Sequence, residues 1–196
     1  MKKIIGKIVI KILGWKIDPN TPKELFEKCV VIAAPHTSNW DYPIAVYSMA
    51  ALGVNLRYTI KKDWMKFPYG GFFKLMGGIG VDRSIPNNRH QRVNLVSAIA
   101  NLFKKHDQLA VIVQAEGTRA LQKKWKTGFY YIALEANVPI ALGYLDYQKK
   151  VSGIGKMIYP TGDIHRDMSE IMDFYKNITP KFSDKFALDE RYSGSK

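Results

Sequence analysis

The sequence predicts an α/β fold, with a single domain built on a mixed, largely parallel central sheet flanked by helices. Three observations carry this prediction. The length of 196 residues suits one domain. Short apolar runs rich in β-branched residues alternate along the chain with longer runs in which apolar residues recur at helical spacing. The short runs are apolar throughout, which is typical of strands covered by helices on both faces of a sheet.

The first 17 residues, MKKIIGKIVIKILGWKI, form a basic amphipathic segment. On a helix, Ile4, Ile8, Ile12 and Trp15 share one face and Lys3, Lys7 and Lys11 line another. Lysines interrupt any apolar stretch long enough for a secretory signal or a membrane span. We expect a helix lying in the plane of an anionic membrane surface. An ordinary surface or edge element is the alternative, since isoleucine and valine also favour a strand.

The expected domain covers residues 18–190. Its strands share β-branched, apolar sequences and are predicted at Cys29–Ala34, Asn55–Ile60, Ile79–Val81, Leu109–Val113, Pro139–Leu145 and a last strand ending at Met157–Tyr159. The helices lie between or after them, from about Trp40 to Leu52 and over Asn88–Lys105, Phe129–Ala136 and Asp167–Lys176. The longest of these helices has Val93, Val96, Ala100 and Phe103 at helical spacing.

Composition limits the classes of partner. Lys and Arg exceed Asp and Glu by 30 to 17, which gives a formal net charge of +13. This charge favours an anionic partner, either nucleic acid, an anionic membrane or a phosphate-bearing substrate. The 46% hydrophobic content excludes a disordered chain, and the single cysteine, Cys29, excludes a disulfide framework. Known metal and nucleotide-hydrolysis motifs are absent, so we expect no metal.

The segment after the first apolar strand carries a histidine and an aspartate, His36 and Asp41, five residues apart. It joins a strand to a helix, so it lies at the carboxyl end of a strand, where open α/β sheets bind ligands. A carboxylate can orient a neighbouring imidazole and stabilise its charged form, which is the base half of a catalytic triad. The alternative is structural, with Asp41 stabilising the start of the helix.

Two further segments bring arginines to the ends of strands. Glu116-Gly117-Thr118-Arg119 directly follows the strand LAVIV, and Arg83 follows a short strand behind several glycines. Glycine allows a backbone to approach a ligand closely, and arginine can bind a phosphate with two hydrogen bonds. A turn closed by a surface ion pair is the alternative in each case.

Taken together, these segments resemble the glycerolipid acyltransferase family, whose bacterial type is 1-acyl-glycerol-3-phosphate acyltransferase. The family carries an HxxxxD block, a GxxxxDR-like block, an EGTR block and a VPI block, in this order. Here they are His36 to Asp41, Gly78 to Arg83, Glu116 to Arg119 and Val138-Pro139-Ile140. A family segment of aromatic-Lys-x-Gly is similar to Trp125-Lys126-Thr127-Gly128. The residue before His36 is a proline where the family usually has asparagine.

The resemblance implies transfer of a fatty acyl group from a thioester to a hydroxyl, in phospholipid biosynthesis. His36 would act as the general base and Asp41 would orient it. The substrate-binding residues would be Arg83, Glu116, Gly117, Thr118, Arg119 and Lys126. No cofactor is implied, because acyl-CoA or acyl carrier protein brings the acyl group as a co-substrate.

The expected partners are an acyl thioester, a lysophospholipid such as 1-acyl-glycerol-3-phosphate, an anionic membrane surface and acyl carrier protein, but no nucleic acid. The protein would then work as a peripheral protein at the cytoplasmic face of the membrane. Two alternatives stay open, an acyltransferase for another lysolipid such as a lyso-ornithine lipid, and a non-catalytic basic lipid- or nucleic-acid-binding module.

A segment rich in aromatic residues and lysines precedes Arg83. It contains Trp64, Phe67, Tyr69, Phe72 and Phe73 with lysines between them. Such a pattern can stack nucleic-acid bases. Because of its place before the arginine, we favour an acyl-chain groove or a membrane-facing surface, with core packing as the alternative.

Overall fold

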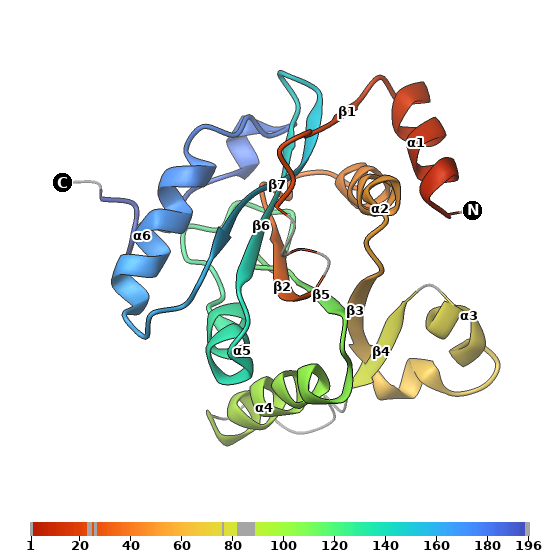
Figure 1. Cartoon of the computed structure of the whole chain (residues 1–196). Helices are drawn as coiled ribbons and strands as arrows, with labels where there is room; N and C mark the ends of the chain where they lie inside the picture. The colour runs from red at the N-terminus through yellow and green to blue at the C-terminus, as the bar shows by residue number, and fades with distance from the viewer. Residues whose placement is uncertain (1, 23–24, 26, 76, 82–88, 195–196) are drawn as a thin grey trace.

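The computed structural model describes residues 2–22, 25, 27–75, 77–81 and 89–194 (Figure 1). The described residues form a seven-stranded sheet in the order β1-β7-β6-β2-β5-β3-β4. The strands are β1 (Lys16–Ile17), β2 (Lys28–Ala33), β3 (Leu56–Lys61), β4 (Gly78–Val81), β5 (Leu109–Val113), β6 (Ile140–Asp146) and β7 (Val151–Ile158). All neighbouring strands are parallel except β6 and β7, which pair in antiparallel fashion. The predicted α/β fold with a mixed, largely parallel sheet is therefore confirmed.

The helices that the sequence predicted are present, with small shifts at their ends. They are α2 (Asp41–Leu52), α4 (Arg89–Lys105), α5 (Gly128–Ala136) and α6 (Ile164–Tyr175). The sequence analysis did not predict the two-residue strand β1, the 3-10 helix η2 (Lys62–Met65) or the short helix α3 (Gly70–Leu75). For β7 the sequence predicted only the end, at Met157–Tyr159, because Ser152, Gly153 and Gly155 interrupt its apolar run. Residues with low intrinsic strand preference are held here by pairing with β6.

Helices cover both faces of the sheet, which explains why its central strands are apolar throughout. Val30 and Ile32 of β2 belong to a core shared with α4, α5 and α6. Cys29 and Val31 point the other way, into a core that includes Met49 of α2. Figure 1 shows α2 and α6 on opposite sides of β6 and β7, in agreement with these two cores.

The N-terminal segment forms helix α1 (Lys2–Ile12), which packs against α2. A side-chain carbon at Gly6 would lie 2.5 Å from the backbone nitrogen of Ala51, so glycine allows the two helices to approach closely. The other side of α1 leaves Ile4, Ile5, Ile8 and Ile12 exposed, and Ile12 is 77% exposed. Among the described residues, no helix has the length and apolar character needed to cross a membrane.

The expected place of Trp15 on the exposed isoleucine face is wrong. The helix ends at Ile12, and Gly14 has a φ of 72°, a left-handed conformation that turns the chain. Trp15 is consequently only 8% exposed and belongs to a core cluster with Ile10 of α1, Ile44 of α2 and Leu145 of β6.

Candidate active site

Three adjacent parallel strands bring the main site residues to one edge of the sheet. β2 pairs with β5 on one side and with β6 on the other, and Ile32 lies opposite both Val113 and Leu142. The carboxyl ends of all three strands therefore meet. His36 follows β2, Glu116 follows β5, and Tyr147 follows β6.

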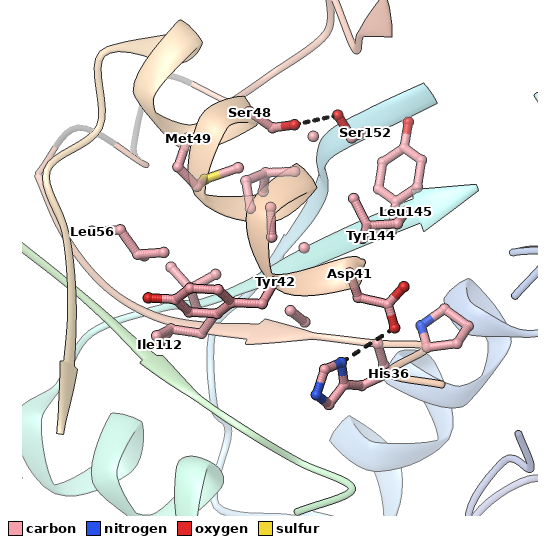
Figure 2. Close-up of a pocket in the computed structure, with 18 of the residues that line it drawn as sticks. His36, Asp41, Tyr42, Ser48, Met49, Leu56, Ile112, Tyr144, Leu145 and Ser152 are labelled. Carbon is pink, nitrogen blue, oxygen red and sulfur yellow. Dashed lines mark hydrogen bonds and ion pairs between the residues drawn. The ribbon is translucent and has the colours of Figure 1, made fainter. Parts of the chain in front are cut away.

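His36 and Asp41 contact each other in the way that the sequence predicted. The imidazole Nδ1 lies 3.3 Å from the carboxylate Oδ2 of Asp41, and Figure 2 shows the two side chains facing each other. Asp41 is the first residue of α2 and is buried, whereas His36 is partly exposed. Because Nδ1 is turned toward the carboxylate, Nε2 is the ring nitrogen available to accept a proton from a ligand.

Besides His36, three groups contact the Asp41 carboxylate. The backbone N–H groups of Thr37 and Ser38 both donate to Oδ2 at 2.8 Å, and the hydroxyl of Tyr147 donates to Oδ1 at 2.6 Å. Burial raises the pKa of Asp41, but the hydrogen bonds from His36, Tyr147 and Ser38 outweigh it and leave the pKa below its ordinary value. The carboxylate is thus kept ionised beside the imidazole.

Sequence reasoning missed Tyr147, which lies outside every motif described above. Its position could be found only by combining two facts, that it directly follows β6 and that β6 neighbours β2. The first is visible in the sequence, whereas the second is a property of the sheet order.

Glu116 also reaches the loop that carries His36. Its Oε1 accepts a hydrogen bond of 2.8 Å from the backbone N–H of His36, while its Oε2 is buried and has no hydrogen-bond partner among the described residues. Burial raises the pKa of Glu116 to about 7, although the His36 N–H acts in the opposite direction. The Glu116 carboxyl group therefore holds the backbone of His36 in place, although the two residues are 80 positions apart in the sequence.

The rest of the EGTR block lies against the same loop. Arg119 donates a hydrogen bond to the side-chain oxygen of Asn39, three residues beyond His36, and its side chain is exposed. Gly117 has a φ of 74°, and a side-chain carbon there would collide with the ammonium end of Lys126. Thr118 is exposed, and its hydroxyl accepts a hydrogen bond from Ala120 N–H. Arg119 thus contacts the loop that carries His36, and the side chain of Lys126 lies against Gly117 of the EGTR block.

Two of the predicted motifs are not part of the site in the described structure. Arg83 lies outside the described residues, although β4, which precedes it, ends at the same edge of the sheet as β3. Val138-Pro139-Ile140 lies at the amino end of β6, at the opposite edge from His36, and Pro139 accepts a hydrogen bond from Val30 N–H. This block therefore begins a central strand, at the end of β6 away from Tyr147.

An apolar cavity opens beside His36 and Asp41 and runs between α2 and the sheet (Figure 2). It holds about 640 Å³, its open mouth included. Its walls include apolar side chains from α2, β3, β5 and β7, among them Ala45, Met49, Leu56, Ile112 and Ile154. The hydroxyls of Ser48 and Ser152, which also line it, bond to each other at 2.6 Å. The cavity is therefore suited to an apolar ligand, because most of its lining is apolar and its two serine hydroxyls bond to each other.

None of the described side chains of the aromatic segment 64–73 lines this cavity. Phe67 is 98% exposed and Tyr69 is also exposed, so at these two positions core packing is excluded. The prediction of an acyl-chain groove does not fit this cavity, whereas a membrane-facing surface stays a prediction. In the part of the chain that the structure describes, no cluster of His, Cys, Asp and Glu could hold a metal ion.

Comparisons with known proteins agree with this architecture. The family model described as Acyltransferase matches residues 17–141. The crystal structure of PlsC, the 1-acyl-sn-glycerophosphate (LPA) acyltransferase of Thermotoga maritima, is similar, with a TM-score of 0.56 and 16% sequence identity. The match covers 89% of this chain and 75% of the PlsC chain, and at this identity it supports the fold. A search of curated proteins finds no match. Because the family model covers well over half of the chain and includes the His36–Asp41 pair and the EGTR block, the chain belongs to the acyltransferase family.

Proposed function

We propose that the protein transfers a fatty acyl group from a thioester, either acyl-CoA or an acyl carrier protein, to the hydroxyl of a lysophospholipid. The observation that carries this proposal is the His36–Asp41 pair at the mouth of an apolar cavity. A base at the end of an apolar cavity suits a reaction whose reacting carbon is attached to a long hydrocarbon chain. Membership of the acyltransferase family supports the type of reaction.

The chemistry needs only a base and the two substrates. An alcohol is a poor nucleophile at neutral pH, so Nε2 of His36 takes the proton of the acceptor hydroxyl while its oxygen attacks the thioester carbonyl. The carbon–sulfur bond then breaks, and the imidazolium returns the proton to the departing thiolate. Asp41 stabilises the imidazolium between these two steps. The products are an ester and a free thiol, and no cofactor takes part.

The cavity would hold the acyl chain. Its apolar lining between α2 and the sheet offers hydrocarbon contacts, and its two serines need nothing from a ligand. Apolar burial contributes about 0.8 kcal/mol for each CH₂ group, so a cavity of this kind distinguishes chain lengths.

Arg119 and Lys126 would bind the anionic part of the acceptor. Both side chains are exposed, Arg119 contacts Asn39 on the loop of His36, and Lys126 lies against Gly117, next to Glu116. A phosphate held by guanidinium and ammonium groups would position the hydroxyl next to it for deprotonation. The similar structure of an LPA acyltransferase supports a phosphate-bearing lysolipid as the acceptor. Arg83 is proposed for the same role.

Helix α1 would dock the protein on an anionic membrane as a peripheral protein of the cytoplasmic face. Its exposed isoleucines can enter the acyl boundary while its lysines meet lipid head groups. Because α1 packs on α2, which lines the cavity, this docking would place the cavity close to its lipid substrates.

The test is a thiol-release assay with several acyl-CoAs, acyl carrier protein thioesters and a panel of lysolipids that includes 1-acyl-glycerol-3-phosphate and lyso-ornithine lipid. The proposal predicts thiol release that depends on a lysophospholipid and yields its acylated product. Activity with only the lyso-ornithine lipid would keep the reaction and change the acceptor. Binding to lipid without any thiol release would identify a non-catalytic module instead.

A further inference from the structure

The two oxygens of the Asp41 carboxylate have different partners. Oδ2 accepts from the backbone of Thr37 and Ser38 and also contacts the imidazole of His36. Oδ1 has the Tyr147 hydroxyl at 2.6 Å, which is a short hydrogen bond to a charged acceptor. Since three groups converge on one oxygen, the hydroxyl on the other oxygen determines how the plane of the carboxylate is turned toward His36.

Tyr147 is itself held in place from two sides. Its backbone N–H donates to Thr179 at 2.9 Å, and the ring meets Trp15 edge to face, with 4.9 Å between the ring centroids. Trp15 is buried between α1, α2 and β6 and comes from the turn after α1. A continuous series of contacts therefore runs from the N-terminal segment through Trp15 and Tyr147 to Asp41.

We propose that Tyr147 is a positioning residue of the acyltransferase site and that Trp15 holds the Tyr147 ring in place. Through these two residues the N-terminal segment influences the geometry of the His36–Asp41 pair. This inference rests on the proposed function for its kinetic test. Both residues lie outside the match to the family model, which covers residues 17–141. The Oδ1 atom of Asp41 would thus be positioned by a residue that the motifs do not contain, whereas the partners of Oδ2 lie within the HxxxxD block.

The expected effect on protonation follows from the charges around the hydroxyl. Four charged or titratable groups surround the Tyr147 hydroxyl and its acceptor: Asp41 itself, His36, Glu116 and Lys181. The Lys181 ammonium lies 5.9 Å from the centre of the Tyr147 ring. Tyr147 stays a proton donor, because burial and the neighbouring carboxylate raise its pKa. Without its hydroxyl, more of the Asp41 charge acts on the imidazole, which then holds its proton more tightly.

The test compares Tyr147→Phe with Tyr130→Phe, a matched control. Tyr130 donates a similar buried hydrogen bond, 2.9 Å long, to Asp167. This bond joins α5 to α6, and neither residue belongs to the His36–Asp41 pair or lines the cavity. Because the Tyr147 hydroxyl bonds to a charged acceptor, we expect kcat of Tyr147→Phe to fall by about tenfold or more. Its KM values stay within about twofold, and the acid limb of its kcat/KM profile moves to higher pH. Tyr130→Phe keeps the wild-type kcat and pH profile. A Tyr147→Phe profile that matches that of Tyr130→Phe would overturn the proposal.

A double-mutant cycle tests the role of Trp15. Trp15→Leu lowers kcat when Tyr147 is present and has no further effect in the Tyr147→Phe background, because the hydroxyl that it positions is already gone. Equal losses in both backgrounds would contradict the link between Trp15 and Asp41. Thermal melting of all variants verifies that they are folded.

An NMR titration keeps this inference separate from the proposed function, because it needs no turnover. The pH midpoint of the His36 imidazole signal is expected to be higher in Tyr147→Phe than in the wild-type protein. This shift would support the positioning role even if no acyl thioester proved to be a substrate. An unchanged midpoint would refute that role even in an active enzyme.

Discussion

Glu116 is predicted to make the stability of the protein depend on pH near neutrality. Its carboxyl group is buried, one oxygen has no hydrogen-bond partner in the described part of the chain, and its pKa is raised from 4.5 to about 7. A raised pKa means that the folded state holds the proton more tightly than the unfolded state does. The stabilising contribution is therefore fully present below pH 4.5 and is lost as the pH rises through 7. The rise of the pKa from 4.5 to about 7 corresponds to a change of about 3 kcal/mol in the free energy of unfolding, at about 1.4 kcal/mol for each pH unit.

The variant Glu116→Gln isolates this effect. Glutamine resembles the protonated carboxyl group, and its side-chain oxygen can still accept the N–H of His36. Urea unfolding should give a difference from wild type that is smallest at pH 4, grows from about pH 4.5 to pH 7 and then levels off, so that the variant gains about 3 kcal/mol relative to wild type between pH 4 and pH 8.5. Glu135→Gln, at an exposed position on α5, is the control and should show no such change. A difference between Glu116→Gln and wild type that stays constant from pH 4 to 8.5 would refute the reasoning.

Three further predictions concern the ligands. Ala45→Phe, which fills part of the cavity from α2, should lower kcat/KM for long-chain thioesters at least tenfold and spare short ones, and equal losses for all chain lengths would contradict the acyl site. The double variant Ile8→Ser, Ile12→Ser should reduce binding to phosphatidylglycerol vesicles at least tenfold in a sedimentation assay, since burying one isoleucine contributes about 1.5–3 kcal/mol. Unchanged vesicle binding would exclude α1 as the docking element. Arg119→Ala should raise the KM for a phosphate-bearing acceptor about tenfold in steady-state kinetics, with little change in the KM for the thioester. A raised KM for the thioester alone would indicate that Arg119 binds the acyl donor instead.

The sequence predicted the central strands because they are buried on both faces and read as continuous apolar runs. Leu109–Val113 was predicted with its observed ends. The elements that it did not predict lack this signal. Strand β1 is two residues long, and α3 contains two glycines among its six residues, so pairing and packing rather than intrinsic preference determine them.

The candidate site could be predicted where local spacing carries the information. His36 and Asp41 lie on one loop, so their contact follows from a short stretch of sequence. The hydrogen bonds of Glu116 to His36 and of Tyr147 to Asp41 span 80 and 106 residues, and they depend on the sheet order that makes β5, β2 and β6 neighbours. Trp15 shows the same limit, because a turn at Gly14 buries a side chain that helical periodicity had placed with the exposed isoleucines.

The most direct test of the proposed acyltransferase mechanism is thiol release from a long-chain acyl thioester with a lysophospholipid acceptor, measured for the wild-type protein and for His36→Ala. Removal of a general base costs about 10²–10⁴-fold in rate, and the variant should stay folded because His36 is partly exposed at the end of a loop. We expect acceptor-dependent thiol release by the wild type and a loss of at least a hundredfold in the variant. Retention of more than a tenth of the wild-type rate by folded His36→Ala would contradict the role of His36 as the base.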